Sequence, residues 1–166
     1  MLMVTPRGMI IHRDADAKEQ SVVERIELWK RAIDVIDSEP WFGTGINTYN
    51  VAHEKYDTAK NWRVRGYYAH NGYLQLAAEI GIPGILFFLL FLAFYFRRAW
   101  RSASALRGTS EELDRLGMIT GLLAFLIYAL ADTNLQSPQS LMSFWILAGA
   151  LAAQTRTQAR PELAKF

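Results

Sequence analysis

His70 is the residue in this sequence with the clearest capacity for acid–base chemistry, and charged residues lie on both sides of it. Arg63 and Arg65 precede it, and Glu79 follows. An arginine stays charged at physiological pH and binds pairs of phosphate oxygens, while a histidine, with an unperturbed pKa of roughly 6.5, can accept a proton near neutral pH. These residue types are therefore candidates for holding an anionic group and for moving a proton, although a histidine without further context is more often a hydrogen-bonded structural group.

Motifs for nucleotide, metal and acyl-transfer sites are absent from the sequence. Gly43-x-Gly45 lacks the preceding strand and the third glycine of a nucleotide-binding fold, and there is no P-loop, HExxH, Gly-x-Ser-x-Gly or carboxylate cluster. The chain has no cysteine, which excludes disulfides and thiolate metal sites. Its net charge is only +2, and the cations gather beside apolar runs, so no nucleic-acid partner is predicted. Because the motifs above are absent, no metal or cofactor is predicted either.

The polar part of the chain, residues 1–79, is expected to hold one clear amphipathic helix over 21–38. Ser21 is a suitable N-cap with Glu24 three residues on, and Pro40 ends the pattern. The apolar positions at helical spacing are Val22, Ile26, Trp29, Ile33 and Ile36. Around this helix the sequence predicts irregular segments at 1–20 and 61–68, a turn at 41–45, a weaker helix at 48–59 and a helix over 69–80.

Three apolar runs without a charge follow, and each approaches the length of a short membrane-spanning helix. They cover residues 80–96, 116–131 and 137–153. The first is apolar on every face, which disfavours the alternative of a buried helix in a soluble protein. The predicted fold class is therefore all-α: a polytopic membrane protein with three transmembrane helices, preceded by an extracytoplasmic helical loop region.

The distribution of Lys and Arg predicts the orientation of these runs in the membrane. The cations of residues 97–115 and of the tail 154–166 are Arg97, Arg98, Arg101, Arg107, Arg115, Arg156, Arg160 and Lys165. The loop 132–136 has none, and its Asp132 is expected to lie at a helix end in water. By the positive-inside rule, 97–115 and the tail are cytoplasmic, and residues 1–79 face the periplasm. No signal peptide precedes that exported segment, so the chain is expected to be the C-terminal part of a larger protein of the bacterial inner membrane.

Two stretches of the polar part carry a resemblance to a known family. The first reads Arg25-x3-Trp29-x2-Ala32, followed by Pro40-x2-Gly43-x-Gly45-x3-Tyr49. The second reads His70-Asn71-x9-Gly81-x2-Gly84, with Tyr73, Leu74 and Glu79 inside it. Together with the topology, these motifs resemble the C-terminal portion of the O-antigen ligase and polymerase superfamily (the Wzy/WaaL type). The resemblance extends over roughly residues 21–153.

The resemblance implies a metal-independent glycosyltransferase without a cofactor. Such an enzyme moves a glycan from undecaprenyl pyrophosphate to an acceptor hydroxyl on lipid A core, a growing polysaccharide or a protein. It implies His70 and Arg25 as catalytic residues, since the hydroxyl must lose a proton and the departing pyrophosphate builds up negative charge. The residues expected to bind substrate are Arg65, Arg63, Asn71, Tyr68 and Glu79. Membrane lipid is the remaining expected partner.

The main alternative is a membrane component without catalytic activity, such as a transporter subunit or an inactive remnant of such an enzyme. Members of the superfamily have more spans upstream, which help to form the groove for the lipid carrier, and a further arginine in an earlier loop. The chain by itself is therefore expected to be inactive. Ligation, polymerisation and transfer to protein all remain open, because these motifs do not specify the acceptor.

Overall fold

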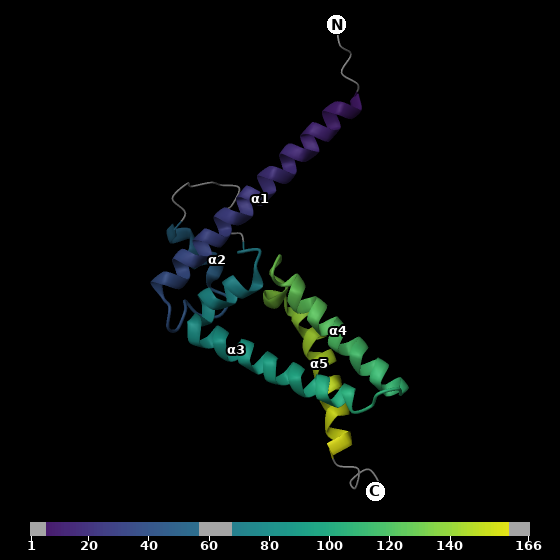
Figure 1. Ribbon diagram of the computed structural model, residues 1–166. Coiled ribbons are helices and arrows are strands. Elements are labelled where there is room, and N and C mark those ends of the chain that lie inside the picture. The colour runs from purple at the N-terminus through teal and green to yellow at the C-terminus, as the bar shows by residue number, and fades with distance from the viewer. Residues whose placement is uncertain (1–5, 57–67, 160–166) are drawn as a thin grey trace.

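The structure is a computed structural model that describes residues 6–56 and 68–159, with side chains for 22–56 and 68–156 (Figure 1). Every regular element in these ranges is helical, which confirms the all-α prediction. The elements are α1 (Pro6–Ser38), α2 (Tyr49–Ala52), the 3-10 helix η1 (His53–Tyr56), α3 (Gly72–Ser104), α4 (Ser110–Tyr128), the 3-10 helix η3 (Asn134–Gln136) and α5 (Pro138–Ala159).

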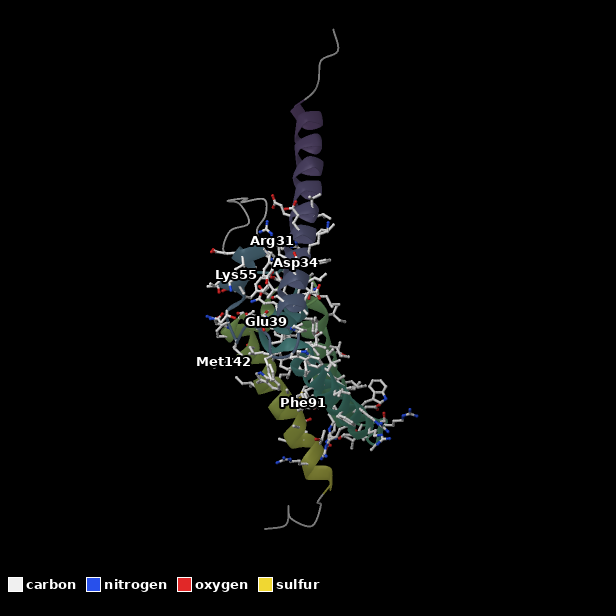
Figure 2. The ribbon with its side chains drawn as sticks, turned by 90° about the vertical axis from the view of Figure 1, so that its left-hand side faces the viewer. Arg31, Asp34, Glu39, Lys55, Phe91 and Met142 are labelled. Carbon is white, nitrogen blue, oxygen red and sulfur yellow. The ribbon has the colours of Figure 1, made fainter. Side chains whose placement is uncertain are left out.

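The molecule divides into a polar and an apolar half. In Figure 1, α3, α4 and α5 form the lower bundle, and α1 lies above it and projects away. In Figure 2 the labelled charged side chains lie around α1 and η1, whereas the labelled apolar side chains lie on the bundle. The charged ones are Arg31, Asp34, Glu39 and Lys55, and the apolar ones are Phe91 and Met142.

Helix α1 is longer than predicted, which corrects two expectations. It begins at Pro6, so 6–20 are helical rather than irregular, and Ser21 lies inside the helix instead of capping it. The physical reason is that no glycine or proline follows Gly8 before Pro40, while Ala, Lys, Glu and Gln, all good helix formers, fill this stretch. Proline is also well suited to the first position of a helix.

The apolar stripe that predicts α1 packs on the rest of the described chain only in part: Ile36 packs against a small core, and Trp29 is half-buried. Val22, Ile26 and Ile33 are exposed. The buried apolar residues of α1 are Leu28, Ala32 and Val35, and the last two belong to a small core with Tyr49, Ala69 and Ala78. This small core joins α1 to α2 and to the first turns of α3.

Helix α3 begins at Gly72, later than the predicted start at 69, and it is broken at Gly81, whose φ of 74° and ψ of 172° are not helical. Such dihedrals are open almost only to glycine. The break coincides with Pro83, which has no N–H to donate to the carbonyl of Glu79 as a continuous helix would require. The N–H of Gly45 makes this bond instead, at 2.9 Å.

Two more backbone hydrogen bonds fasten the loop after α1 to this break. The N–H of Thr44 donates to the carbonyl of Ala78 at 3.0 Å, and the N–H of Ile82 donates to the carbonyl of Pro40 at 2.8 Å. Gly43, with a φ of 67°, lies so close that a Cβ on it would be 2.4 Å from the α3 backbone. Gly43 and Gly45 of the first motif and Gly81 of the second therefore serve one contact, which we call the glycine lock: residues 40–45 against residues 78–82.

The bundle of α3, α4 and α5 has its own apolar core. Its buried residues include Leu92, Ile119, Leu122, Phe144 and Leu151. Arg115, predicted to lie in a cytoplasmic loop, is instead a buried residue of α4. Its guanidinium donates to Ser102 of α3 and, at 3.1 Å, to the carbonyl of Gln154 of α5. One side chain thus ties the three helices together at this end.

Among the described helices, α3 alone is long and apolar enough to cross a membrane, so the three predicted spans are not all confirmed. Only 28% of its apolar stretch is buried, whereas the core helix of a soluble protein would be mostly buried. The predicted runs 116–131 and 137–153 do form helices, but α4 also contains the charged residues Glu111, Glu112 and Asp114 in its first turns. Helix α5 begins with the polar run 138–140.

Candidate functional site

The segment around His70 is fastened to the corner that follows α4, which we call the α4 corner (residues 129–136). Asn71 is the N-cap of α3, and its Oδ1 accepts hydrogen bonds from the N–H groups of Tyr73 and Leu74, both at 3.1 Å. The N–H of Gly72 donates to the carbonyls of Ala129 at 2.7 Å and Asp132 at 2.9 Å. These bonds fix the backbone directly after the position from which the imidazole projects.

Gly72 lies directly against the α4 corner. A Cβ at this position would be 3.2 Å from the side chain of Leu135. The amide of Gln136 adds a hydrogen bond to the carbonyl of Gly72 at 3.1 Å. The start of α3 and the α4 corner therefore form one rigid contact.

His70 itself has an unusual backbone conformation, with a φ of 49°. For a residue with a side chain, left-handed dihedrals cost on the order of 1–2 kcal/mol. Such strain persists only where the surrounding contacts impose it, and it is often found at functional sites. Here the hydrogen bonds of Asn71 and Gly72 impose it.

The imidazole of His70 faces a carboxylate of the α4 corner. Its Nδ1 lies 3.8 Å from Oδ1 of Asp132. This is an electrostatic contact rather than a hydrogen bond, and such contacts can tighten when substrate binds. The two side chains are 34% and 38% exposed, so a substrate can reach both.

Asp132 is held as a carboxylate by its neighbours. Its Oδ2 accepts from the hydroxyl of Tyr128 at 2.5 Å, and its Oδ1 accepts from the N–H of Thr133 at 2.8 Å. The hydrogen bond from Tyr128, then that from Thr133, and then the charges of His70 and Arg25 lower the pKa of Asp132 from its ordinary value. A negative charge therefore stands beside the imidazole at neutral pH.

Arg25 reaches the same corner from α1. Its Nη1 donates to the carbonyl of Ala131 at 3.3 Å, and its side chain is exposed. The two residues predicted to be catalytic thus lie on adjoining positions of one corner, Arg25 at Ala131 and His70 at Asp132. A guanidinium, an imidazole and a carboxylate are brought together from three separate parts of the chain.

The other predicted site residues do not all lie at this corner. Tyr68 is exposed and precedes His70 by two positions, while the Asn71 side chain caps α3. Arg63 and Arg65 lie outside the described residues. Glu79 is only 3% exposed and lies away from the corner, next to the glycine lock.

The carboxylate of Glu79 makes contacts of a structural kind. Its Oε1 accepts from the N–H of Tyr49 at 3.4 Å and from the amide of Gln75 at 3.3 Å. Tyr49 is fully buried and donates its hydroxyl to the carbonyl of Leu28 at 3.3 Å, and burial raises its pKa well above the ordinary range. Glu79 therefore holds α2 against α3, and Tyr49 joins α2 to α1.

Asp132 is the site residue that sequence reasoning missed. The sequence predicts a residue at a helix end in water. Asp132 does lie just beyond the end of α4 with a side chain that is 38% exposed, but it also faces His70. The available signal was that 116–155 contains no other charged residue. Within the described ranges, no group of three His, Asp or Glu side chains comes close enough to hold a metal ion.

The comparisons with known proteins agree with the motifs. The family model for the O-antigen ligase matches residues 1–89, which is more than half of the 166-residue chain. The matched region includes Arg25, His70 and the glycine lock, and it ends inside α3. No curated protein and no solved structure matches the sequence. The chain therefore belongs to the O-antigen ligase family.

Proposed function

We propose that the α4 corner transfers a glycan from undecaprenyl pyrophosphate to an acceptor hydroxyl, without a metal ion, on the outer side of the inner membrane. Membership of the family indicates a function of the O-antigen ligase or polymerase type. The observation that carries the proposal is the meeting of Arg25 and His70 at Ala131 and Asp132, because the reaction needs a cation and a base near one carbon atom.

His70 is the base in this proposal. With the Nδ1–H directed at the carboxylate of Asp132, the lone pair of the neutral imidazole lies on Nε2. Nε2 takes the proton of the acceptor hydroxyl as its oxygen bonds to the anomeric carbon. Asp132 fixes the orientation of the ring and stabilises the imidazolium that forms, as a carboxylate does in other histidine-based sites.

Arg25 stabilises the leaving group. As the new bond forms, the bond between the anomeric carbon and the pyrophosphate oxygen breaks, and negative charge grows on the lipid-linked pyrophosphate. A guanidinium that is already in place can pair with phosphate oxygens in a bidentate manner. The bond to Ala131 uses one of its donors, and the others can bind phosphate. Arg63 and Arg65 stay predictions for further contacts with the same group.

The membrane placement follows from the charge distribution. We infer that α4 and α5 cross the membrane together with α3, with the Arg-rich 97–115 inside the cell and the α4 corner outside. Trp41, Phe42 and Ile46 are 71%, 88% and 81% exposed. They lie in and directly after the loop that the glycine lock holds beside the start of the apolar stretch, and tryptophan favours the membrane interface. A lipid carrier also places its pyrophosphate at the membrane interface.

The test is substitution in the chromosomal gene of the host. His70→Ala and Arg25→Ala should abolish surface glycan assembly, seen as loss of laddering on gels, while immunoblots show a normal amount of protein in the membrane. Lys30→Ala removes an exposed charge from the same helix and should leave the ladder unchanged. Normal laddering in both the His70 and the Arg25 variants would refute the proposal. The molecule on which the glycan is found identifies the acceptor class.

A further inference from the structure

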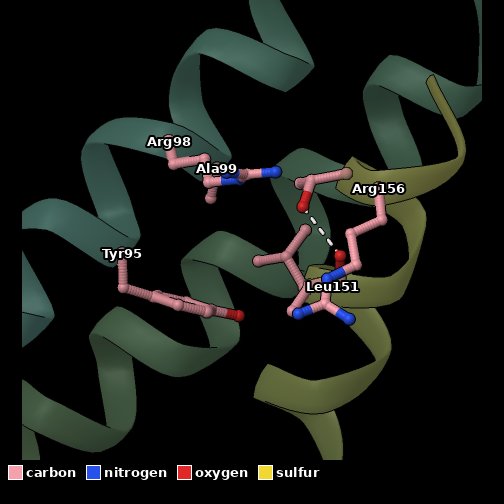
Figure 3. Close-up of a pocket in the computed structure, with 7 residues that line it drawn as sticks. Tyr95, Arg98, Ala99, Leu151 and Arg156 are labelled. Atoms are coloured by element: carbon pink, nitrogen blue, oxygen red, sulfur yellow. Dashed lines mark hydrogen bonds between the residues drawn. The ribbon is translucent and has the colours of Figure 1, made fainter. Parts of the chain in front are cut away.

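A cavity separates α3 from α5 at the end of the bundle remote from the α4 corner. Its volume is about 230 Å³. Its lining residues are Tyr95, Arg98 and Ala99 of α3, and Leu151, Ala152, Thr155 and Arg156 of α5. Figure 3 shows the side chains of Arg98 and Arg156 extending from the two helices toward the space between them. Nothing in the proposed glycan transfer uses this cavity.

The apolar side of the cavity is fixed by helix packing. The hydroxyl of Tyr95 donates to the carbonyl of Ala148 at 2.6 Å, which holds α3 at a set distance from α5. Ala99 and Leu151 are buried and form the floor. The hydroxyl of Thr155 donates to the carbonyl of Ala152 at 2.8 Å, so its proton is already used. The two guanidinium groups are therefore the donors that the cavity offers to a ligand.

Arg98 and Arg156 have no partner for their charge within the described part of the chain, where neither forms an ion pair or a side-chain hydrogen bond. Arg115, at the same end of the bundle, is satisfied by Ser102, Gln154 and, at 4.0 Å, Glu111. Two unpaired cations on a partly apolar cavity attract an anion, and guanidinium groups bind phosphate oxygens with particular strength.

We propose that this cavity binds the phosphodiester headgroup of an anionic phospholipid. A lipid fits better than free phosphate because the cavity continues into an apolar surface. Phe91 stacks near Tyr95 and Trp145, with ring centroids 6.2 Å apart in both pairs. Phe91 and Trp145 are 49% and 44% exposed and can contact an acyl chain. Basic pockets between transmembrane helices on the cytoplasmic side are known places for anionic headgroups.

The bound lipid would join the ends of α3 and α5 where Arg115 already joins them through α4. The proposal rests on the membrane placement given above but not on the chemistry of glycan transfer. It predicts that the bundle needs an anionic lipid for full stability.

The test uses the full chain in a neutral detergent. Dioleoylphosphatidylglycerol should be retained in native mass spectra and should raise the melting temperature, whereas dioleoylphosphatidylcholine should not. Arg98→Gln combined with Arg156→Gln should weaken binding of the anionic lipid by about tenfold or more, in line with loss of two charge-assisted contacts. Arg97→Gln combined with Arg101→Gln is the matched control, because both residues are exposed at the same end of α3 and neither lines the cavity.

Three results would overturn the proposal. The first is equal binding of the anionic lipid by the cavity variant and the wild type. The second is an equal loss in the control variant, which would show diffuse attraction by the whole basic end. The third is equal stabilisation by inorganic phosphate alone, which would show an anion site without lipid. Lipid binding is measured without glycan transfer, so failure here and failure of the proposed function are distinguishable.

Discussion

Replacing Gly81 by alanine tests whether the glycine lock holds the polar half onto α3. A Cβ at this position would lie 2.5 Å from the carbonyl oxygen and 2.6 Å from the carbonyl carbon of Trp41, so the loop 40–45 would have to move away. Those atoms belong to backbone and cannot rotate aside as a side chain could. The movement would break the three backbone hydrogen bonds that join the loop to residues 78–82.

The expected loss of docking free energy in Gly81→Ala is the sum of two contributions. The φ of 74° and ψ of 172° at Gly81 lie in a region that costs a residue with a side chain about 1–3 kcal/mol. Each lost hydrogen bond contributes about 1 kcal/mol net, and there are three. With the lower end of the first contribution, the docking of the loop should therefore weaken by about 4 kcal/mol, which is roughly a thousandfold change in its opening equilibrium.

Amide hydrogen exchange measures this opening directly. In peptides covering 40–46 and 79–84, the amides of Thr44, Gly45 and Ile82 should exchange up to about a thousandfold faster in Gly81→Ala than in the wild type. Gly117→Ala is the control, because no atom lies within 4 Å of its added Cβ and alanine favours a helix. Exchange at the three amides within about threefold of the wild type would refute this account of the lock.

Four further predictions concern the corner and the membrane interface. Asp132→Asn should slow glycan transfer by at least about tenfold, less than the ~10²–10⁴ expected for loss of the base His70, and unchanged laddering kinetics would contradict it. The pKa of Asp132 is lower in the fold than its ordinary 3.8, so its ionised carboxylate stabilises the folded state at neutral pH. This stabilisation is lost as the pH falls below 3.8, and the melting curves of Asp132→Asn and the wild type should converge there. Asn71→Ala removes the α3 cap and should cost about 1 kcal/mol in thermal melts, whereas Asn71→Asp should retain most of the stability. The chain has no cysteine, so an introduced cysteine can be labelled specifically with an environment-sensitive dye. In vesicles the dye on Phe42→Cys should report an apolar medium, whereas the same dye on Asn50→Cys should not. Equal spectra would exclude the interfacial position of Phe42.

Local patterns in the sequence account for the helices, and tertiary contacts account for the departures. The run 9–39 contains no glycine or proline, and this continuity extends α1 beyond the cap that Ser21 could supply. The stripe of Val22, Ile26 and Ile33 has helical period but remains exposed. Periodicity shows that a helix has a face, and only the neighbouring elements decide which face is buried.

The sequence motifs name Arg25 and His70 as candidates, but they do not predict the geometry that brings the two residues to one corner. Arg25 and His70 could be named from their motifs, and their chemical types suit pyrophosphate departure and proton removal. Their meeting depends on Asp132 and Ala131, which follow α4 and are remote from both in sequence. A single carboxylate in a charge-poor stretch gives no local sign of its partner, because pairing across such a separation is a product of the fold.

The structure gives a physical reason for the spacing between His70-Asn71 and Gly81 in the second motif. His70 and Asn71 lie at the α4 corner, Gly81 lies in the glycine lock, and residues 72–80 form the helical rod between them. At 1.5 Å per residue this rod is about 13 Å long, and each added or removed residue would turn one end by about 100° relative to the other. Both ends are fixed by backbone hydrogen bonds to different parts of the chain, so such a turn could not satisfy them together. The distance from the histidine to the glycine is therefore set by the need to hold His70 at the α4 corner and Gly81 in the glycine lock at the same time.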